Sequence, residues 1–195
     1  MATRSGDRKA QILQALAQML ENPAPEKITT AALAAKLDVS EAALYRHFSG
    51  KAQMFEGLIE FIEQTVFALL NKIAAEEKSG VRQIEAMVGV LLGFAQKNCG
   101  MTRVLIGDAL VNEDQRLQAR INQLHDRLEA TLKQALRFGA TQQEFAAGVD
   151  VAAHANLLMS FVTGRWHQFA KSGFKRDPVE LWNLQRRQLM EGVIA

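Results

Sequence analysis

The chain has 195 residues, of which 48% are hydrophobic and 23% are charged, and its formal net charge is +2. This composition is typical of a globular protein and excludes a disordered one, and the length suffices for one domain or two small ones. Cys99 is the single cysteine, which excludes an intramolecular disulfide framework. The N-terminus lacks the apolar stretch of a signal peptide, and the longest apolar run, 86–95, is too short to cross a bilayer. We therefore expect a cytoplasmic protein that does not span a membrane.

The first predicted element is a helix over residues 7–21, followed by a proline-containing turn over 22–27. Apolar residues recur along the helix at spacings of three and four, so one face is expected to be buried. That face consists of Ile12, Leu13, Leu16, Ala17 and Leu20.

Residues 29–48 predict two short helices around a tight turn. Either Thr29 or Thr30 can cap the first helix, and Ser40 can cap the second. Asp38 occupies the turn, where an aspartate tolerates a left-handed backbone. The residues expected to face inward are Leu33, Ala34, Leu37, Leu44 and Phe48. This pattern is typical of a helix-turn-helix, whose second helix enters the major groove of DNA.

The residues that this motif leaves exposed suit contact with double-stranded DNA. Ala42 and Ala43 are small enough to let the helix approach base edges. Tyr45 and His47 can donate to phosphate oxygens, and Arg46 can reach a phosphate or a guanine. The helix N-termini at Thr29, Thr30 and Ser40 and the cation Lys51 are further candidate contacts. The predicted DNA-binding residues are therefore Thr29, Thr30, Ser40, Ala42, Ala43, Tyr45, Arg46, His47 and Lys51. The alternative is a helical corner that only packs.

The excess of positive charge lies in the same part of the chain. Residues 1–51 hold seven Lys or Arg and five Asp or Glu, whereas the remainder holds sixteen of each sign. A difference of two charges supports a nucleic-acid partner without establishing one.

In this region the chain resembles the TetR family of transcriptional regulators. The resemblance rests on residues 28–30 and 39–48, and on Lys51 followed by Met54-Phe55. It implies an all-α fold of about nine helices, in which a three-helix DNA-binding domain precedes a C-terminal helical core that forms a homodimer.

We place the DNA-binding domain at residues 1–51, extending to about 66 with the start of the next helix, and the core and dimerisation domain at 52–195. Candidate strands are hard to find. Three further helices are predicted next: a long helix over 51–77, a helix from Ser79-Gly80 to about 98–100, and a short helix to about 106. A second long helix follows, in which leucines recur from Leu117 to Leu136 and Gly139 is the C-terminal glycine. After a loop over 140–149, Asp150 caps a helix over 150–171, and a last helix starts at Asp177-Pro178.

The last two helices are rich in large apolar side chains, which favours a homodimer interface over the alternative of an ordinary core within one chain. One recognition helix reads too few bases to be selective, so a two-fold dimer on a palindromic site is expected. The predicted interface residues are Leu158, Phe161, Val162, Trp166, Trp182 and Leu189.

Later segments, at residues 58–63, 91–94 and 116–124, are similar to the nucleoid occlusion factors within the TetR family. In those proteins the groove between the fourth and fifth helices binds the tubulin-like division protein FtsZ while the dimer sits on DNA. The resemblance assigns this surface to Phe61, Gly93, Lys97 and Asn98. The sequence departs from the family pattern at Leu69, where a basic residue is usual, and at Cys99, where proline is usual.

A helical wheel of residues 51–77 predicts one broad buried stripe, which consists of Phe55, Leu58, Ile59, Ile62, Val66, Leu69, Leu70 and Ile73. Phe61 and Phe67 fall outside it, so each either packs on another helix or contacts a partner. Gly89 and Gly93 share one face of the next helix, which indicates close approach of another helix, from this chain or from a partner.

The leading interpretation is a nucleoid-associated factor that binds palindromic DNA as a homodimer and antagonises FtsZ ring assembly. One alternative is a ligand-responsive repressor, in which Met87, Phe94 and Trp166 line a small-molecule cavity instead of filling the core. Another is a helical scaffold that binds proteins and not DNA. The sequence has no phosphate-binding glycine loop, Gly-x-Ser-x-Gly elbow or metal-ligand cluster, so we expect no enzyme, cofactor or metal.

Overall fold

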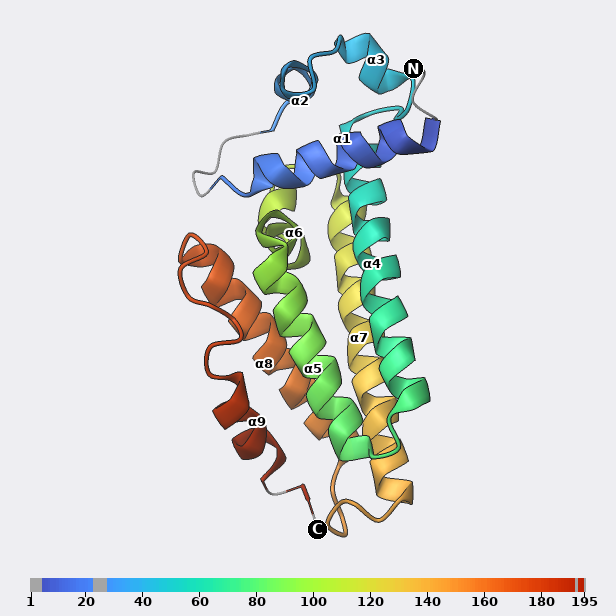
Figure 1. Ribbon diagram of the computed structural model, residues 1–195, viewed down its shortest axis with the longest axis vertical. Helices are drawn as coiled ribbons and strands as arrows, with labels where there is room; N and C mark the ends of the chain where they lie inside the picture. The colour runs from blue at the N-terminus through green and yellow to red at the C-terminus, as the bar shows by residue number, and fades with distance from the viewer. Residues whose placement is uncertain (1–4, 23–27, 192, 195) are drawn as a thin grey trace. The chain divides into compact units, whose positions relative to one another are not determined.

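The computed structural model describes residues 5–22, 28–191 and 193–194. Regular structure in these residues is helical, apart from one isolated antiparallel bridge between Phe145 and Ile194, so the predicted all-α fold is confirmed (Figure 1). The described elements are α1 Ser5–Leu20, α2 Thr30–Lys36, α3 Glu41–Tyr45, α4 Lys51–Glu76, α5 Gly80–Lys97, α6 Cys99–Leu105, the 3-10 helix η1 Asp108–Leu110, α7 Gln115–Thr141, α8 Val151–Lys171 and α9 Trp182–Met190. The predicted proline turn lies, apart from Asn22, outside the described residues.

The chain divides into two compact units. One consists of Met1–Ile62 and Asn98–Ile121, and the other of Glu63–Lys97 and Asn122–Ala195. No helix among the described residues is both long and apolar enough to cross a membrane. The predicted division of function near residue 51 stays a prediction.

In the first unit, α1 holds α4 and α6 at close range. A Cβ atom at Gly100 would lie 2.0 Å from the carbonyl oxygen of Ala17, so α6 meets the backbone of α1 where only glycine fits. A Cβ atom at Gly57 would lie 3.3 Å from side-chain atoms of both Leu13 and Phe48. The helix-turn-helix is therefore seated on α4 through Phe48, over a core that includes Ile12, Leu16, Leu33, Leu44, Met54, Phe55 and Leu58.

In the second unit, α8 and α9 pack against α5 (Figure 1). The indole nitrogen of Trp166 on α8 donates to the carbonyl oxygen of Leu91 at 3.0 Å, and its ring lies 5.8 Å from that of His125 on α7. Because Trp166 is 1% exposed and its one donor is satisfied, it anchors α8 to α5 without leaving an unpaired polar group.

The structure corrects the expected end of the long leucine-bearing helix. Gly139 does not end α7, which runs on to Thr141; the left-handed residue that follows is Gln143, with φ of 59°. Gly139 instead serves packing, because a Cβ atom on Gly80 would lie 2.4 Å from its Cα. The two glycines let α5 and α7 approach each other closely.

The start of the last helix is also corrected. Asp177 and Pro178 lie in a turn, and α9 begins only at Trp182. The Asp177 carboxylate accepts from the Gln96 side-chain nitrogen at 2.7 Å and from the Val179 backbone nitrogen at 2.9 Å, which holds the turn against α5. The predicted cap Asp150 is confirmed, since its carboxylate accepts from two backbone N–H groups in the first turn of α8, and these bonds lower its pKa.

Two residues of the predicted stripe on α4 are not buried, because Ile73 is half-buried and Leu69 is exposed. Leu69 is 43% exposed, whereas Val66 and Leu70 are 2% and 0% exposed. Leu69 lies near one edge of the stripe, and the packed side of the helix in this turn is the opposite edge, formed by Val66 and Leu70. A helical wheel averages over the whole length of a helix and does not detect such a local rotation.

Candidate nucleic-acid interface

The backbone of the helix-turn-helix follows the sequence closely. Thr29 caps α2 by accepting from the Ala32 nitrogen at 3.1 Å, and Ser40 caps α3 by accepting from the Ala43 nitrogen at 3.3 Å. Asp38 has φ of 52°, so the turn passes through the predicted left-handed residue. The capped N-termini leave backbone N–H groups pointing outward, which favours an anion such as a DNA phosphate.

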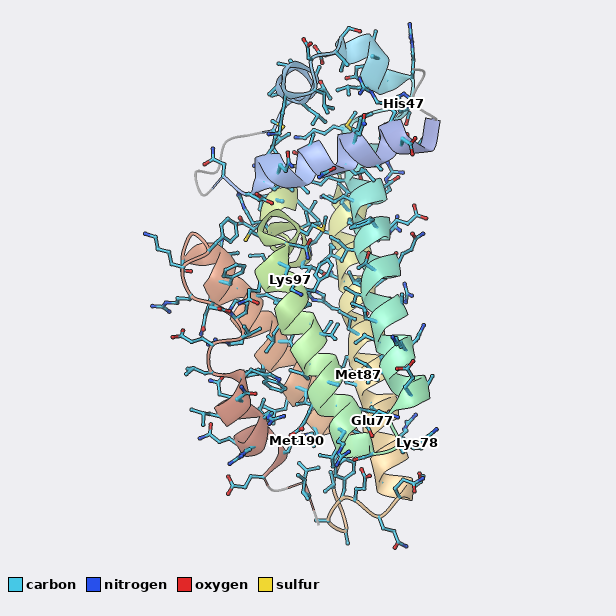
Figure 2. The ribbon with its side chains drawn as sticks, in the orientation of Figure 1. His47, Glu77, Lys78, Met87, Lys97 and Met190 are labelled. Carbon is cyan, nitrogen blue, oxygen red and sulfur yellow. The ribbon has the colours of Figure 1, made fainter. Side chains whose placement is uncertain are left out.

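Burial separates the two faces of α3 as predicted. Leu44 is 1% exposed and Phe48, just after the helix, is 6% exposed, so the inner face is closed. On the other face Tyr45 is 48% exposed, Ala42 and Arg46 are exposed, and Ala43 and His47 are half-buried. Figure 2 labels His47 in the turn that follows α3. The structure therefore brings the predicted DNA-facing residues of this segment onto one accessible surface, while their contact with DNA stays a prediction.

A polar cluster links the two helices of the motif. The Thr30 hydroxyl donates to the Glu41 carboxylate at 2.5 Å, and the Tyr45 hydroxyl donates to the Thr30 hydroxyl at 3.5 Å. The sequence pattern gives no signal for this bond between Glu41 and α2. This cluster positions Tyr45, because its hydroxyl is held beside the N-terminus of α2.

Lys51 differs from the other predicted DNA contacts, because its charge is already paired. Its ammonium group forms an ion pair with the Glu113 carboxylate, and the two side chains are 19% and 15% exposed. The ammonium also lies 5.7 Å from the centre of the Phe55 ring. The residues near Lys51 line a cavity of about 320 Å³ whose other charged members are Arg103 and Asp108. Spacing in the sequence gives no signal for a pair 62 residues apart.

The residues of the predicted protein-binding surface belong to different units, Phe61 and Asn98 to the first and Gly93 and Lys97 to the second. Phe61 is 46% exposed in the first unit, whereas Phe67 in the second is half-buried and lies beneath the Arg127 guanidinium at 4.3 Å. Arg127 also pairs with Glu63 at 3.3 Å. Packing within the chain thus accounts for Phe67 and leaves Phe61 as the exposed aromatic of α4.

The two glycines of α5 have different surroundings. A Cβ atom at Gly89 would lie 3.2 Å from the indole nitrogen of Trp182, so α9 approaches this position. A Cβ atom at Gly93 would meet nothing within 4 Å. Lys97, labelled in Figure 2 at the C-terminal end of α5, is exposed, and Asn98 is half-buried. Internal packing explains the glycine at 89 and does not explain the glycine at 93.

The predicted dimer residues divide into core and surface. Leu158, Val162 and Trp166 are at most 1% exposed within one chain, so packing in the chain itself already buries them, and their part in a dimer interface stays a prediction. Their side chains fill the contact of α8 with its own neighbours, the alternative that the sequence left open. Phe161, Trp182 and Leu189 are half-buried, and the large apolar residues exposed nearby are Leu157, Leu181 and Leu184.

An N-terminal helix-turn-helix on a chain whose described residues are helical defines this protein as a helical regulator of the DNA-binding class. Two family models match it: residues 12–58 match bacterial regulatory proteins of the tetR family, and residues 78–193 match the tetracyclin repressor-like C-terminal domain of the SlmA-like type. The chain belongs to the TetR family of DNA-binding regulatory proteins and, within it, to the group of the nucleoid occlusion factors SlmA.

Relatives and solved structures agree with this assignment. The chain is 51% identical over 184 residues to nucleoid occlusion factor SlmA of Alteromonas mediterranea, with 94% of each chain covered. It is 47% identical to that of a Marinomonas species, covering 100% of this chain and 98% of the relative. A TetR transcription regulator from Haloarcula marismortui shares the fold, with a TM-score of 0.82, 15% identity and coverage of 97% and 100%. FadR from Bacillus subtilis, solved in complex with stearoyl-CoA, has a TM-score of 0.79, 17% identity and coverage of 94% and 98%.

Proposed function

We propose that this protein is a nucleoid occlusion factor that binds palindromic chromosomal sites as a homodimer and antagonises FtsZ ring assembly over the nucleoid. The observation that carries the DNA half of the proposal is the accessible face of α3, where Ala42, Tyr45 and Arg46 are exposed over a closed inner face. Residues 1–51 act as the DNA-binding domain, and residues 52–195 form the core and dimerisation domain. The protein acts by binding and not by catalysis.

The DNA contacts divide into two kinds. Ala42, Ala43 and Arg46 face the base edges, because small side chains admit the helix to the groove and a guanidinium can bond a guanine. Phosphate contacts come from the capped N-termini at Thr29, Thr30 and Ser40 and from Tyr45, His47 and Lys51. The first kind sets sequence preference, and the second sets affinity and its dependence on salt.

Dimerisation uses the exposed apolar residues of the C-terminal part. Leu157, Leu181 and Leu184 are 50%, 44% and 67% exposed, and the half-buried Phe161 and Trp182 rings lie 6.0 Å apart beside them. Exposed apolar side chains gathered in one region are typical of an interface. Leu158, Val162 and Trp166 support this surface from the interior.

FtsZ contacts Phe61 and Asn98 in the first unit and Gly93 and Lys97 in the second. Phe61 is a large aromatic left exposed, and Gly93 has open space where a side chain would lie. An exposed aromatic and a residue-sized space on a helix are features that let a partner approach closely. Leu69, which is also exposed, adds an apolar contact on α4.

A ligand-responsive repressor is the second candidate, and the cavity beside Lys51 is the observation that bears on it. Its volume of about 320 Å³ is at the lower end of the range for ligand sites. The cavity is lined, however, by residues of the first unit, whose charged groups pair with one another. Met87, Phe94 and Trp166 are at most 7% exposed and fill the core of the second unit.

Co-sedimentation with polymerised FtsZ from the same bacterium tests the proposal. A palindromic duplex selected from random DNA by the protein is added or omitted. We expect the protein to pellet with the polymer more strongly when the duplex is present, and Phe61→Ala to remove this effect without changing DNA affinity. Specific DNA binding with no recovery in the FtsZ pellet would favour the repressor, and no DNA binding at low salt would favour a protein-binding scaffold.

A further inference from the structure

The segment Asp108–Glu113, here called the acidic segment, holds two cations near the DNA-binding helices. At its end, Glu113 forms the ion pair with Lys51, the first residue of α4. At its start, the Asp108 carboxylate accepts from the Arg103 guanidinium at 2.9 Å. Both pairs lie in the first unit and line the same cavity.

Arg103 extends this arrangement to the end of α1. Its guanidinium donates to the backbone carbonyl oxygens of Leu20, at 3.4 Å, and Asn22, at 3.2 Å. The acidic segment is therefore linked through Arg103 to the end of α1, and through Glu113 to Lys51, the first residue of α4. A movement of this segment would change both contacts at once.

We propose that Glu113 is an internal competitor of DNA, which occupies Lys51 in the free protein and must release it when a phosphate binds. The proposal rests on the proposed DNA-binding function and assigns a regulatory element to that site. A carboxylate and a phosphate present the same anionic oxygen acceptors to an ammonium group. The Lys51 charge cannot be fully available to a phosphate while Glu113 neutralises it.

Burial makes this competition stronger than at an ordinary surface pair. Both side chains are less than one-fifth exposed, so their attraction is screened less by water than that of an exposed pair. When Lys51 turns to the duplex, Glu113 loses its cation in a partly desolvated position. DNA affinity is thus reduced by the cost of separating the pair, and any partner that moves the acidic segment changes that affinity.

The test compares neighbouring carboxylates and a change that preserves charge. Glu113→Gln removes the competing charge. Asp114→Asn removes the same charge one residue further on, from a carboxylate that holds Arg116 at 2.7 Å and not Lys51. Glu113→Asp keeps the charge but shortens the side chain, so it weakens the pair without altering the net field on DNA. The affinity of each variant for the selected duplex is measured over a series of salt concentrations, together with its melting temperature.

We expect Glu113→Gln to tighten DNA binding about three- to tenfold at low salt, because it removes a partly buried pair that competes with phosphate. Glu113→Asp should tighten binding by a smaller factor, and Asp114→Asn should change it less than twofold. In a Lys51→Gln background, Glu113→Gln should have no further effect.

Equal effects of Glu113→Gln and Asp114→Asn, a Glu113→Asp affinity unchanged from the parent, or a Glu113→Gln effect that persists without Lys51 would each overturn the proposal. A parent protein that binds no selected duplex at low salt would instead contradict the proposed function. If Glu113→Gln lowers the melting temperature enough to reduce the folded fraction, the charge-preserving variant still decides the question.

Discussion

The helix-turn-helix and the C-terminal helices use apolar residues in different ways. In α2 and α3, Leu33 and Leu44 are both 1% exposed and the polar residues face outward, so sequence pattern and burial agree. In α8, Leu157 and Leu158 are adjacent and identical, yet one is 50% exposed and the other is fully buried. A short motif with its own caps defines its faces locally, whereas the apolar residues of a bundle are assigned by the neighbouring helices.

The largest expected effect is the dissociation of the homodimer by substitutions on the surface that we assign to dimerisation. Leu157→Glu combined with Leu184→Glu should dissociate the homodimer, because each change places a charge where an apolar contact is buried. Burial of one leucine side chain contributes about 1.5–3 kcal/mol relative to leaving it exposed. Analytical ultracentrifugation over a concentration series measures the effect. Val111→Glu, on an exposed apolar residue of the first unit, is the matched control and should leave the dimer intact. An unchanged dimer in the double variant would remove this surface from the account.

The next largest expected effect is a loss of DNA affinity when the exposed face of α3 is changed at Arg46. Arg46→Ala should weaken binding to the selected duplex by about ten- to hundredfold if the guanidinium reads a base. Because we assign Arg46 to base edges, the slope of log affinity against log salt should fall less for Arg46→Ala than for loss of the phosphate contact Lys51. Arg82→Ala, on an exposed arginine of α5, provides the control with the same change of charge. Equal losses in the two variants would mean that Arg46 acts only through its general charge.

Substitutions at the two glycines of α5 should differ in stability, because Gly89 is packed against α9 and Gly93 has open space beside it. Gly93→Ala should stabilise the fold by about 0.5–1 kcal/mol, because alanine restricts the unfolded chain and nothing lies near the new methyl group. Gly89→Ala should give no such gain, since its methyl group must displace the Trp182 indole. Urea denaturation measures both. The same Gly93→Ala protein should bind FtsZ less well while keeping its DNA affinity.

Equal stabilisation by Gly89→Ala would show that α9 does not press on α5 in solution. Full FtsZ binding by Gly93→Ala would remove Gly93 from the proposed partner surface. The unfolding measurement and the FtsZ-binding measurement are independent, so either prediction can be contradicted while the other holds.

The smallest effect concerns pH. Burial lowers the pKa of His154 on α8 below its ordinary value of 6.5. The unfolded chain therefore takes up a proton before the folded chain does, so this contribution to stability is complete above about pH 6.5 and is lost as pH falls through the folded pKa. His154→Leu should flatten the fall of melting temperature between about pH 7 and pH 5. His167→Gln, on an exposed histidine of the same helix, is the matched control for loss of an imidazole.

Local signals in the sequence predicted much of the fold. The caps Thr29, Ser40 and Asp150 and the left-handed Asp38 act within two or three residues along the chain, so their roles follow from residue type. The all-α class of fold is predicted from the spacing of apolar residues by three and four, a pattern that is long and regular in α4 and α7.

The features that sequence reasoning missed depend on contacts between distant residues. Gly139 looked like a helix end, but Gly80 on another helix determines its role. Lys51 looked like a free cation, but Glu113 is 62 residues away along the chain. Trp166 is buried within its own chain, where its indole nitrogen donates to the carbonyl oxygen of Leu91 on α5. No pattern within one helix carries this information.

The most direct measurement is the affinity of the protein for three duplexes made from its selected site: both half-sites intact, one half-site scrambled, and the spacing between half-sites changed by five base pairs. If two copies of α3 enter successive grooves of one duplex, each alteration should lower the affinity of the parent protein at least about tenfold. Equal affinity of the parent protein for all three duplexes would contradict the account.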